Sequence, residues 1–202
     1  MNAEMQALYW RIQNNLNSGL DAVSLLMPAA DGEPDTVMPT EVSYCSRRSG
    51  AAAKQFDVRW SDEDSDLFLS LLDRVSNPED AEDDDGMVLD INDGVVQGIV
   101  QLVALARFKT PWPSDELVAG DINTVREELE IGDLVAVHTR YGSPMAIVVG
   151  QDSIDVTCIL LEDIVREGRS IVPDHSVFVV NRCCVLPPAF AESDSGEAAV
   201  FH

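Results

Sequence analysis

The chain has 202 residues, 46% of them hydrophobic, which is enough for one domain with a substantial core or for two small domains. Its 36 acidic residues outnumber its 13 basic residues and give a formal net charge of −23. That charge repels anionic partners, so direct binding to nucleic acid is disfavoured and a basic protein surface is favoured as partner. No apolar run reaches the roughly 18 residues of a membrane-spanning helix, which excludes a membrane role.

The N-terminal segment 2–16 predicts an amphipathic helix that packs on the core or docks on a partner or a second copy. Its apolar residues fall three or four apart, on one helical face: Met5, Leu8, Tyr9, Ile12 and Leu16. The same segment lacks the basic region and apolar core of a secretory signal peptide. We therefore expect a protein of the cytoplasm or of a virus particle. Further along, residues 31–39 have loop composition, residues 42–45 predict a short strand, and the alternating residues 55–60 predict another.

Two longer helices are predicted in the central part of the chain. Ser61 opens a helix over 61–75, with Asp64 three residues later as in a capping box. A second helix, over 94–108, is apolar on nearly every side and ends before two prolines, so it should be deeply buried. Another capping-box pattern predicts a short helix over 125–129.

Acidic residues concentrate between Asp57 and Asp93, where 14 acids and two arginines give a net charge of −12 in 37 residues. The other 165 residues share the remaining −11. The chain has 22 aspartates and only two lysines, which is typical of proteins adapted to strong salt. The uneven distribution argues against salt adaptation as the whole explanation and leaves a partner-binding acidic surface as the alternative. Its candidate residues are Asp62, Glu63, Asp64, Asp66, Glu79, Asp80, Glu82, Asp83, Asp84 and Asp85.

The first acids of this surface do not form an EF-hand calcium loop, because Leu67 stands where that loop requires glycine.

Residues 132–187 show the clearest organisation. Apolar runs at 134–139, 145–149, 154–161 and 177–186 are separated by turn signals, including a tight turn at 167–170. The gaps are too short for crossover helices, so the runs predict a small antiparallel barrel or meander. The predicted fold class is α+β, with a helical N-terminal and central part packed on a small antiparallel β-barrel-like C-terminal half. We place the boundaries at 1–130 for the mainly helical acidic region, 131–188 for the barrel and 189–202 for a flexible tail.

Three parts of this region, GDLVAV, PMAIVVG and VFVVNRCCVLPP, resemble SH3-like small barrels, including the KOW type. The resemblance covers about a quarter of the chain and implies a module that binds peptides, RNA or protein surfaces, or that has a structural role. Peptide-binding barrels carry an aromatic groove, for which this stretch offers only Tyr141 and Phe178. An RNA-binding barrel needs basic residues, and here four arginines stand against seven acids.

The four cysteines, Cys45, Cys158, Cys183 and Cys184, have no C-x-x-C spacing, so buried reduced thiols are expected. Adjacent Cys183 and Cys184 should point to opposite faces of a strand. The alternative is a zinc site in which Cys158, one of this pair and His175 converge with a fourth ligand. We assign no catalytic residue, cofactor or metal, because the sequence contains no phosphate loop, dinucleotide fingerprint, nucleophile elbow or zinc-protease motif.

These observations favour a non-enzymatic structural, assembly or protein-interaction protein, of a virus for example. It would act on a protein with a basic surface or on other copies of itself. The alternative is an acidic DNA mimic that inhibits a nucleic-acid-binding protein, with the carboxylates of 62–66 and 79–85 in place of phosphates. Mimicry requires carboxylates in rows at roughly phosphate spacing on one face.

Overall fold

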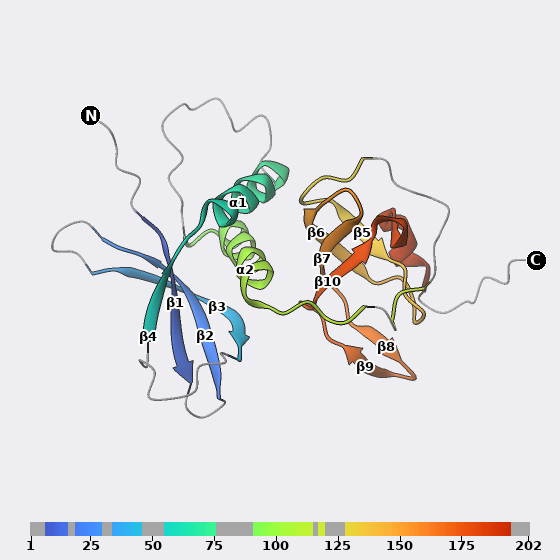
Figure 1. Cartoon of the computed structure of the whole chain (residues 1–202), viewed down its shortest axis with the longest axis horizontal. Coiled ribbons are helices and arrows are strands. Elements are labelled where there is room, and N and C mark those ends of the chain that lie inside the picture. Colours follow the sequence, from blue (N-terminus) through green and yellow to red (C-terminus); the bar gives the residue numbers. More distant parts are fainter. Residues whose placement is uncertain are drawn as a thin grey trace, which may run out of the picture. The chain divides into compact units, whose positions relative to one another are not determined.

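Figure 1 shows the computed structural model of the chain, which describes residues 7–15, 19–29, 34–45, 55–75, 91–114, 117–119 and 128–194. The chain divides into two compact units, Met1–Lys109 and Thr110–His202. Each unit has its own antiparallel sheet. Neither α-helix in the described part of the chain is long and apolar enough to cross a membrane.

The N-terminal unit consists of an antiparallel sheet with two α-helices on one of its faces (Figure 1). The sheet has the strand order β3-β2-β1-β4, so the chain crosses from one edge to the other between its third and fourth strands. The elements are β1 (Tyr9–Asn15), β2 (Leu20–Met27), β3 (Thr36–Tyr44), β4 (Gln55–Arg59), α1 (Asp62–Val75) and α2 (Gly94–Phe108).

The predicted fold class is wrong in its N-terminal part, because the described residues are predominantly β and include only these two α-helices. Where a helix was predicted over 2–16, the structure has strand β1. Trp10 lies opposite Leu25 of β2 on one side and Val58 of β4 on the other, so the strand is paired on both edges. Its tyrosine, tryptophan and isoleucine are residue types that favour β-strands, here a strand in the interior of a sheet. The spacing of the apolar residues between Leu8 and Ile12 fits a helix. The segment forms a strand because β2 and β4, which are not recognisable from this segment alone, pair with it.

Strand β3 also differs from the prediction, because it begins at Thr36 within the predicted loop 31–39 and ends at Tyr44, so it covers all but the last residue of the short strand expected at 42–45. The predictions of β4 and α1 are confirmed, and α2 spans the predicted residues. The expected deep burial of α2 holds for one side only, because Val95 on the other side is 48% exposed. Asp93 caps α2 by accepting a hydrogen bond from the Val95 N–H at 2.7 Å. On the β3 edge, the Glu41 N–H donates to the Gln101 side chain of α2 at 2.9 Å, which satisfies a donor that an edge strand would otherwise expose.

Between the sheet and the helices lies an aromatic cluster centred on Trp10, which is 0% exposed. Its ring stacks on Trp60 with a centroid distance of 4.8 Å and meets the edge of Phe108 at 5.5 Å. Phe108 in turn stacks on Tyr44 at 5.4 Å, and Trp60 meets Phe68 of α1 at 6.2 Å. These contacts join β1, β3, α1 and α2 around one residue.

On the opposite face of the sheet, Arg11 of β1 makes two hydrogen bonds, both of 3.0 Å, to the two carboxylate oxygens of Asp57 in β4. The Arg11 hydrogen bond holds the pKa of Asp57 below its ordinary value. This bidentate pair joins neighbouring strands across the solvent-facing side of the sheet.

The Arg11–Asp57 pair predicts a specific loss of stability in acid. The folded pKa of Asp57 is lower than the unfolded value of 3.8, so the stabilisation is complete above pH 3.8 and is lost as the pH falls through the lowered folded value. Asp57→Asn should remove this part of the pH dependence. Urea unfolding measured from about pH 6 to about pH 2, which spans the window below 3.8, tests this. Arg11→Gln should flatten the profile to the same extent, and an unchanged acid slope in both variants would contradict the assignment.

The C-terminal unit is built on a curved five-stranded antiparallel sheet in the order β10-β7-β6-β5-β11, with β8 and β9 forming a separate hairpin (Figure 1). The predicted strands beginning at 134, 145 and 154 correspond to β5, β6 and β7. The elements are β5 (Leu134–Val137), β6 (Met145–Gln151), β7 (Asp155–Leu160), β8 (Ile164–Arg166), β9 (Arg169–Val172), β10 (Val177–Asn181), β11 (Val185–Leu186) and the 3-10 helices η2 (Arg182–Cys184) and η3 (Pro188–Asp194).

The tight turn predicted near residue 167 is confirmed. Glu167 and Gly168 both have positive φ, 51° and 75°, and connect β8 to β9 as a two-residue hairpin turn of this kind requires. The predicted strand over 177–186 is interrupted, because β10 ends at Asn181 and η2 precedes β11. The Asn181 side chain starts η2 by accepting from the Cys183 N–H at 3.1 Å. Within the predicted tail, η3 extends to Asp194, whereas most of the helix predicted over 125–129 lies outside the described residues.

The core of this unit is filled by short apolar side chains from every strand of the sheet, together with one phenylalanine. Phe178 at its centre is 0% exposed. At the β10 edge, the Trp112 N–H donates to the Val177 carbonyl at 2.7 Å and the Ser114 hydroxyl donates to the Val179 carbonyl at 2.8 Å. Segment 112–114 therefore covers this edge, which would otherwise be open to another strand.

Candidate interaction site

The acidic residues predicted to bind a partner begin at the N-terminus of α1, and Asp64 among them has a structural role. Its side chain is 4% exposed and accepts hydrogen bonds from the Ser61 N–H at 2.9 Å and from the Trp10 indole N–H at 3.1 Å. In return, the Ser61 hydroxyl accepts from the Asp64 N–H at 3.2 Å, which completes the capping box expected from the sequence. Asp64 therefore connects α1 to β1 and is not available to a partner.

Four other acids of α1, Asp62, Glu63, Asp66 and Asp73, are exposed. Asp62, Asp66 and Asp73 are four and seven residues apart, so they share one side of the helix. A hydrogen bond from the Ser61 hydroxyl, another from its own backbone N–H and the charge of Arg107 hold the pKa of Glu63 below its ordinary value. All four side chains are open to solvent, as a charged contact surface requires.

The remaining acidic candidates, Glu79, Asp80, Glu82, Asp83, Asp84 and Asp85, lie outside the described residues. The structure therefore places only the α1 part of the predicted surface.

A mutation pair separates the buried acid of α1 from an exposed one. Asp64→Ala leaves the Trp10 and Ser61 N–H groups without their carboxylate and should lower the free energy of unfolding by about 1–3 kcal/mol. Asp66→Ala on the exposed side should change it by no more than about 0.5 kcal/mol. Urea unfolding followed by tryptophan fluorescence measures both. An equal effect of the two substitutions would show that Asp64 does not hold α1 to β1.

A groove of ≈490 Å³ lies in the C-terminal unit beside β10. The Trp112 side chain at this groove is 40% exposed. Asp155 and Asn181 supply polar groups, and the full lining is Trp112, Pro113, Ser114, Val118, Asp155, Val179, Val180, Asn181 and Cys184. Its volume falls within the range of about 300–1,000 Å³ that is usual for binding pockets.

Trp112 is the residue of this groove that sequence reasoning missed. The two prolines around it predict only the end of the preceding helix, and the aromatic residues that the C-terminal stretch offers for a groove are Tyr141 and Phe178. Phe178 is buried in the core and cannot contact a ligand. The sequence does contain a signal for it. Trp112 lies between two prolines, which exclude a helix or a central strand, so an exposed ring is expected there.

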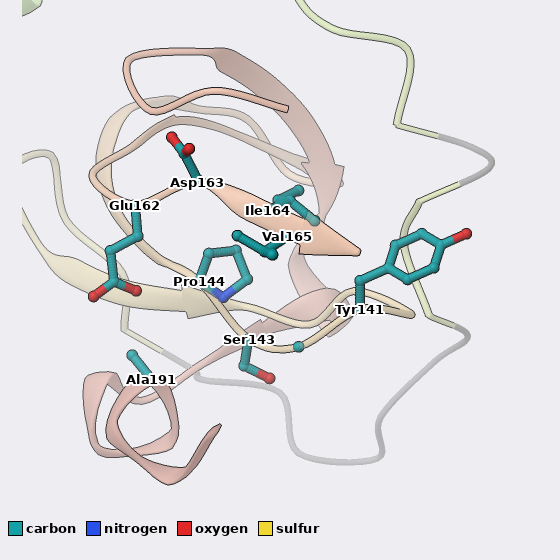
Figure 2. Close-up of a pocket in the computed structure, with 9 residues that line it drawn as sticks. Tyr141, Ser143, Pro144, Glu162, Asp163, Ile164, Val165 and Ala191 are labelled. Carbon is teal, nitrogen blue, oxygen red and sulfur yellow. The ribbon is translucent and has the colours of Figure 1, made fainter. Parts of the chain in front are cut away.

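A second, smaller hollow of ≈150 Å³ lies between the β5–β6 turn, β8 and η3. Figure 2 shows Pro144 near its centre, Tyr141 at its rim, and Glu162 and Asp163 directed to different sides. The Glu162 carboxylate accepts from the Met145 N–H at 3.1 Å, and that of Asp163 accepts from the Asp174 N–H at 2.7 Å. Both acids thus fix loops, and the hollow is smaller than usual ligand pockets.

The residues proposed as alternative zinc ligands do not converge. Within the part of the chain that the structure describes, no group of three or more His, Cys, Asp or Glu side chains could hold a metal ion. Cys158 is 0% exposed, and burial raises the pKa of its thiol to about 12. Cys158 is therefore a core residue.

No protein-family model matches this chain, and no curated protein matches it.

Proposed function

We propose that this is a non-enzymatic structural, assembly or interaction protein that acts through protein–protein contacts. The observation that supports this most directly is the groove beside β10, with the half-exposed ring of Trp112 at its wall. Tryptophan is the residue type most often found at the energetic centre of protein interfaces, and outside interfaces it is seldom left exposed.

The C-terminal unit would act as an SH3-like barrel in this proposal. Its support is the strand order, in which the short last strand β11 pairs with the first strand β5 after the 3-10 turn η2. Modules of this size present grooves at their surface to extended peptides, and aromatic side chains commonly form the groove walls.

The chemistry of the groove specifies the partner peptide. Trp112 and the partly buried Val179 offer an apolar wall for an apolar side chain. Asp155 places a carboxylate in the same lining, so a lysine or arginine next to the apolar residue would be favoured. Strand addition along the covered part of β10 is blocked by segment 112–114, so side chains rather than backbone pairing would determine affinity.

A peptide-display selection against the purified full-length protein tests the groove. Peptides that combine an apolar residue with lysine or arginine should be enriched. Trp112→Ala should weaken their binding by about 30-fold, the loss of a typical hot-spot residue worth about 2 kcal/mol. Phe190→Ala removes another exposed aromatic ring of the same unit and should leave binding unchanged. No enrichment, or equal binding by the Trp112→Ala variant, would overturn the proposal.

One observation favours DNA mimicry as the second candidate. Along the α1 axis, Asp62 and Asp66 are about 6 Å apart, and Asp66 and Asp73 about 10.5 Å. These axial separations are close to the rise along the duplex axis of two and three nucleotide steps, which is about 3.4 Å per step on one strand. The three carboxylates thus form a short row at phosphate-like spacing, interrupted by exposed Leu69.

Displacement of a fluorescent DNA duplex from a panel of basic DNA-binding proteins distinguishes the two candidates. Under the favoured proposal, saturating protein displaces no duplex. Under mimicry, displacement falls steeply with salt, and the variant Asp62→Asn/Asp66→Asn/Asp73→Asn loses it. The variant Glu128→Gln/Glu167→Gln/Asp174→Asn changes the net charge by the same amount at exposed positions of the other unit and should retain it. Equal losses in the two variants would indicate a net-charge effect and exclude mimicry by α1.

A further inference from the structure

Cys183 and Cys184 lie in η2, the 3-10 turn between β10 and β11. The expectation that they occupy opposite faces of a strand is wrong, because the strand ends before them. Their sulfur atoms are 3.9 Å apart, and neither is in a disulfide. The turn therefore brings the two thiols to one side of the chain.

The two thiols differ in exposure and in local contacts. Cys184 is 4% exposed, and its thiol donates to the Ala119 carbonyl at 3.8 Å, whereas Cys183 is half-buried and open in part to solvent. Cys183 packs against the core but is only partly buried, so we expect its thiol to be the one that a small oxidant reaches, and the Cys184 sulfur lies 3.9 Å from it. This arrangement, an accessible thiol beside a resolving thiol, is typical of cysteines that oxidise reversibly.

We infer that Cys183 and Cys184 form a modification site at which a peroxide oxidises the pair to a disulfide between adjacent residues. The inference does not rest on the proposed binding function, although Cys184 is one of the residues that line the groove beside β10.

The peroxide oxidises the two thiols in two steps. The Cys183 sulfur attacks one oxygen of the peroxide, so that an S–O bond forms, the O–O bond breaks and, with hydrogen peroxide, water leaves. The Cys184 sulfur then attacks the Cys183 sulfur of this sulfenic acid, so that the S–S bond forms, the S–O bond breaks and a second water leaves. Two thiols are oxidised, and one peroxide is reduced to two waters.

The product should be easily reduced again. Neighbouring α-carbons are about 3.8 Å apart, which is shorter than the usual 4.4–6.8 Å separation across a disulfide. The resulting strain favours reduction, so a thiol reductant should restore the pair. The strain would fall on η2, where the Cys184 carbonyl accepts a hydrogen bond from the His138 N–H at 2.9 Å. Oxidation is therefore expected to loosen this bond next to the β5–β11 pairing.

Mass spectrometry of the peroxide-treated full-length protein tests the site directly. Trypsin cleaves after Arg182 and finds no later lysine or arginine, so peptide 183–202 contains both cysteines and no other. After treatment, denaturation and alkylation, this peptide should be two hydrogens lighter than its reduced form and carry no alkyl group. Reduction before alkylation should restore two alkyl groups. Faster hydrogen exchange at the His138 amide should accompany oxidation.

Oxidation of exposed Cys45 serves as the control that the peroxide has reacted with the protein. Buried Cys158 should stay reduced. Cys183→Ser and Cys184→Ser should each abolish the two-hydrogen loss, whereas Cys45→Ser should retain it. The inference is overturned if Cys45 is oxidised while peptide 183–202 still accepts two alkyl groups. It is also overturned if that peptide gains oxygen atoms instead of losing hydrogens.

Discussion

The fold depends on which groups donate hydrogen bonds to an excess of carboxylates. With 36 acids and 13 bases, most carboxylates have no cation to pair with, and for several acids of the described residues backbone N–H groups take that place. Hydrogen bonds to ionised acceptors are stronger than neutral ones, so each such acid fixes a turn or a helix start. The Asp155 and Ile154 N–H groups, for example, hold the pKa of Asp152 below its ordinary value. Acids used in this way include Asp64, Asp93, Asp152, Glu162 and Asp163.

In the N-terminal unit, one of these acids, Asp64, also contacts the aromatic core through the Trp10 indole N–H. The Asp64 carboxylate is buried because it accepts from both the capped helix and the Trp10 indole, and a buried charge without such donors would be costly. Trp10 then contacts Trp60 and Phe108, so one carboxylate links helix capping to packing of the sheet. An acid that the charge pattern assigned to a binding surface therefore belongs to the core, and the exposed acids of α1 are what remains for a partner.

The sequence predicted those parts of the fold whose signals are local. Capping residues, helical periodicity and turn chemistry located α1, α2 and the turn at Glu167–Gly168, and continuous apolar runs located β6 and β7. It did not predict β1 and β2, because their identity depends on pairing between segments far apart in the chain. For the candidate site, exposed Asp62, Glu63 and Asp66 were found from charge alone. The Trp112 groove and the Cys183–Cys184 pair were not, because both follow from where β10 ends and what covers its edge.

The covered edge also determines what kind of binding the C-terminal unit can support. Because Trp112 and Ser114 already occupy the Val177 and Val179 carbonyls, a partner cannot gain backbone hydrogen bonds there by adding a strand. Its affinity must come from burying side chains against the ring of Trp112, which concentrates the binding energy in few residues. The charge of −23 would act differently on the proposed basic partner, by attracting it over a screening length and raising its association rate. Loss of the tryptophan should therefore affect mainly dissociation, and loss of surface acids mainly association.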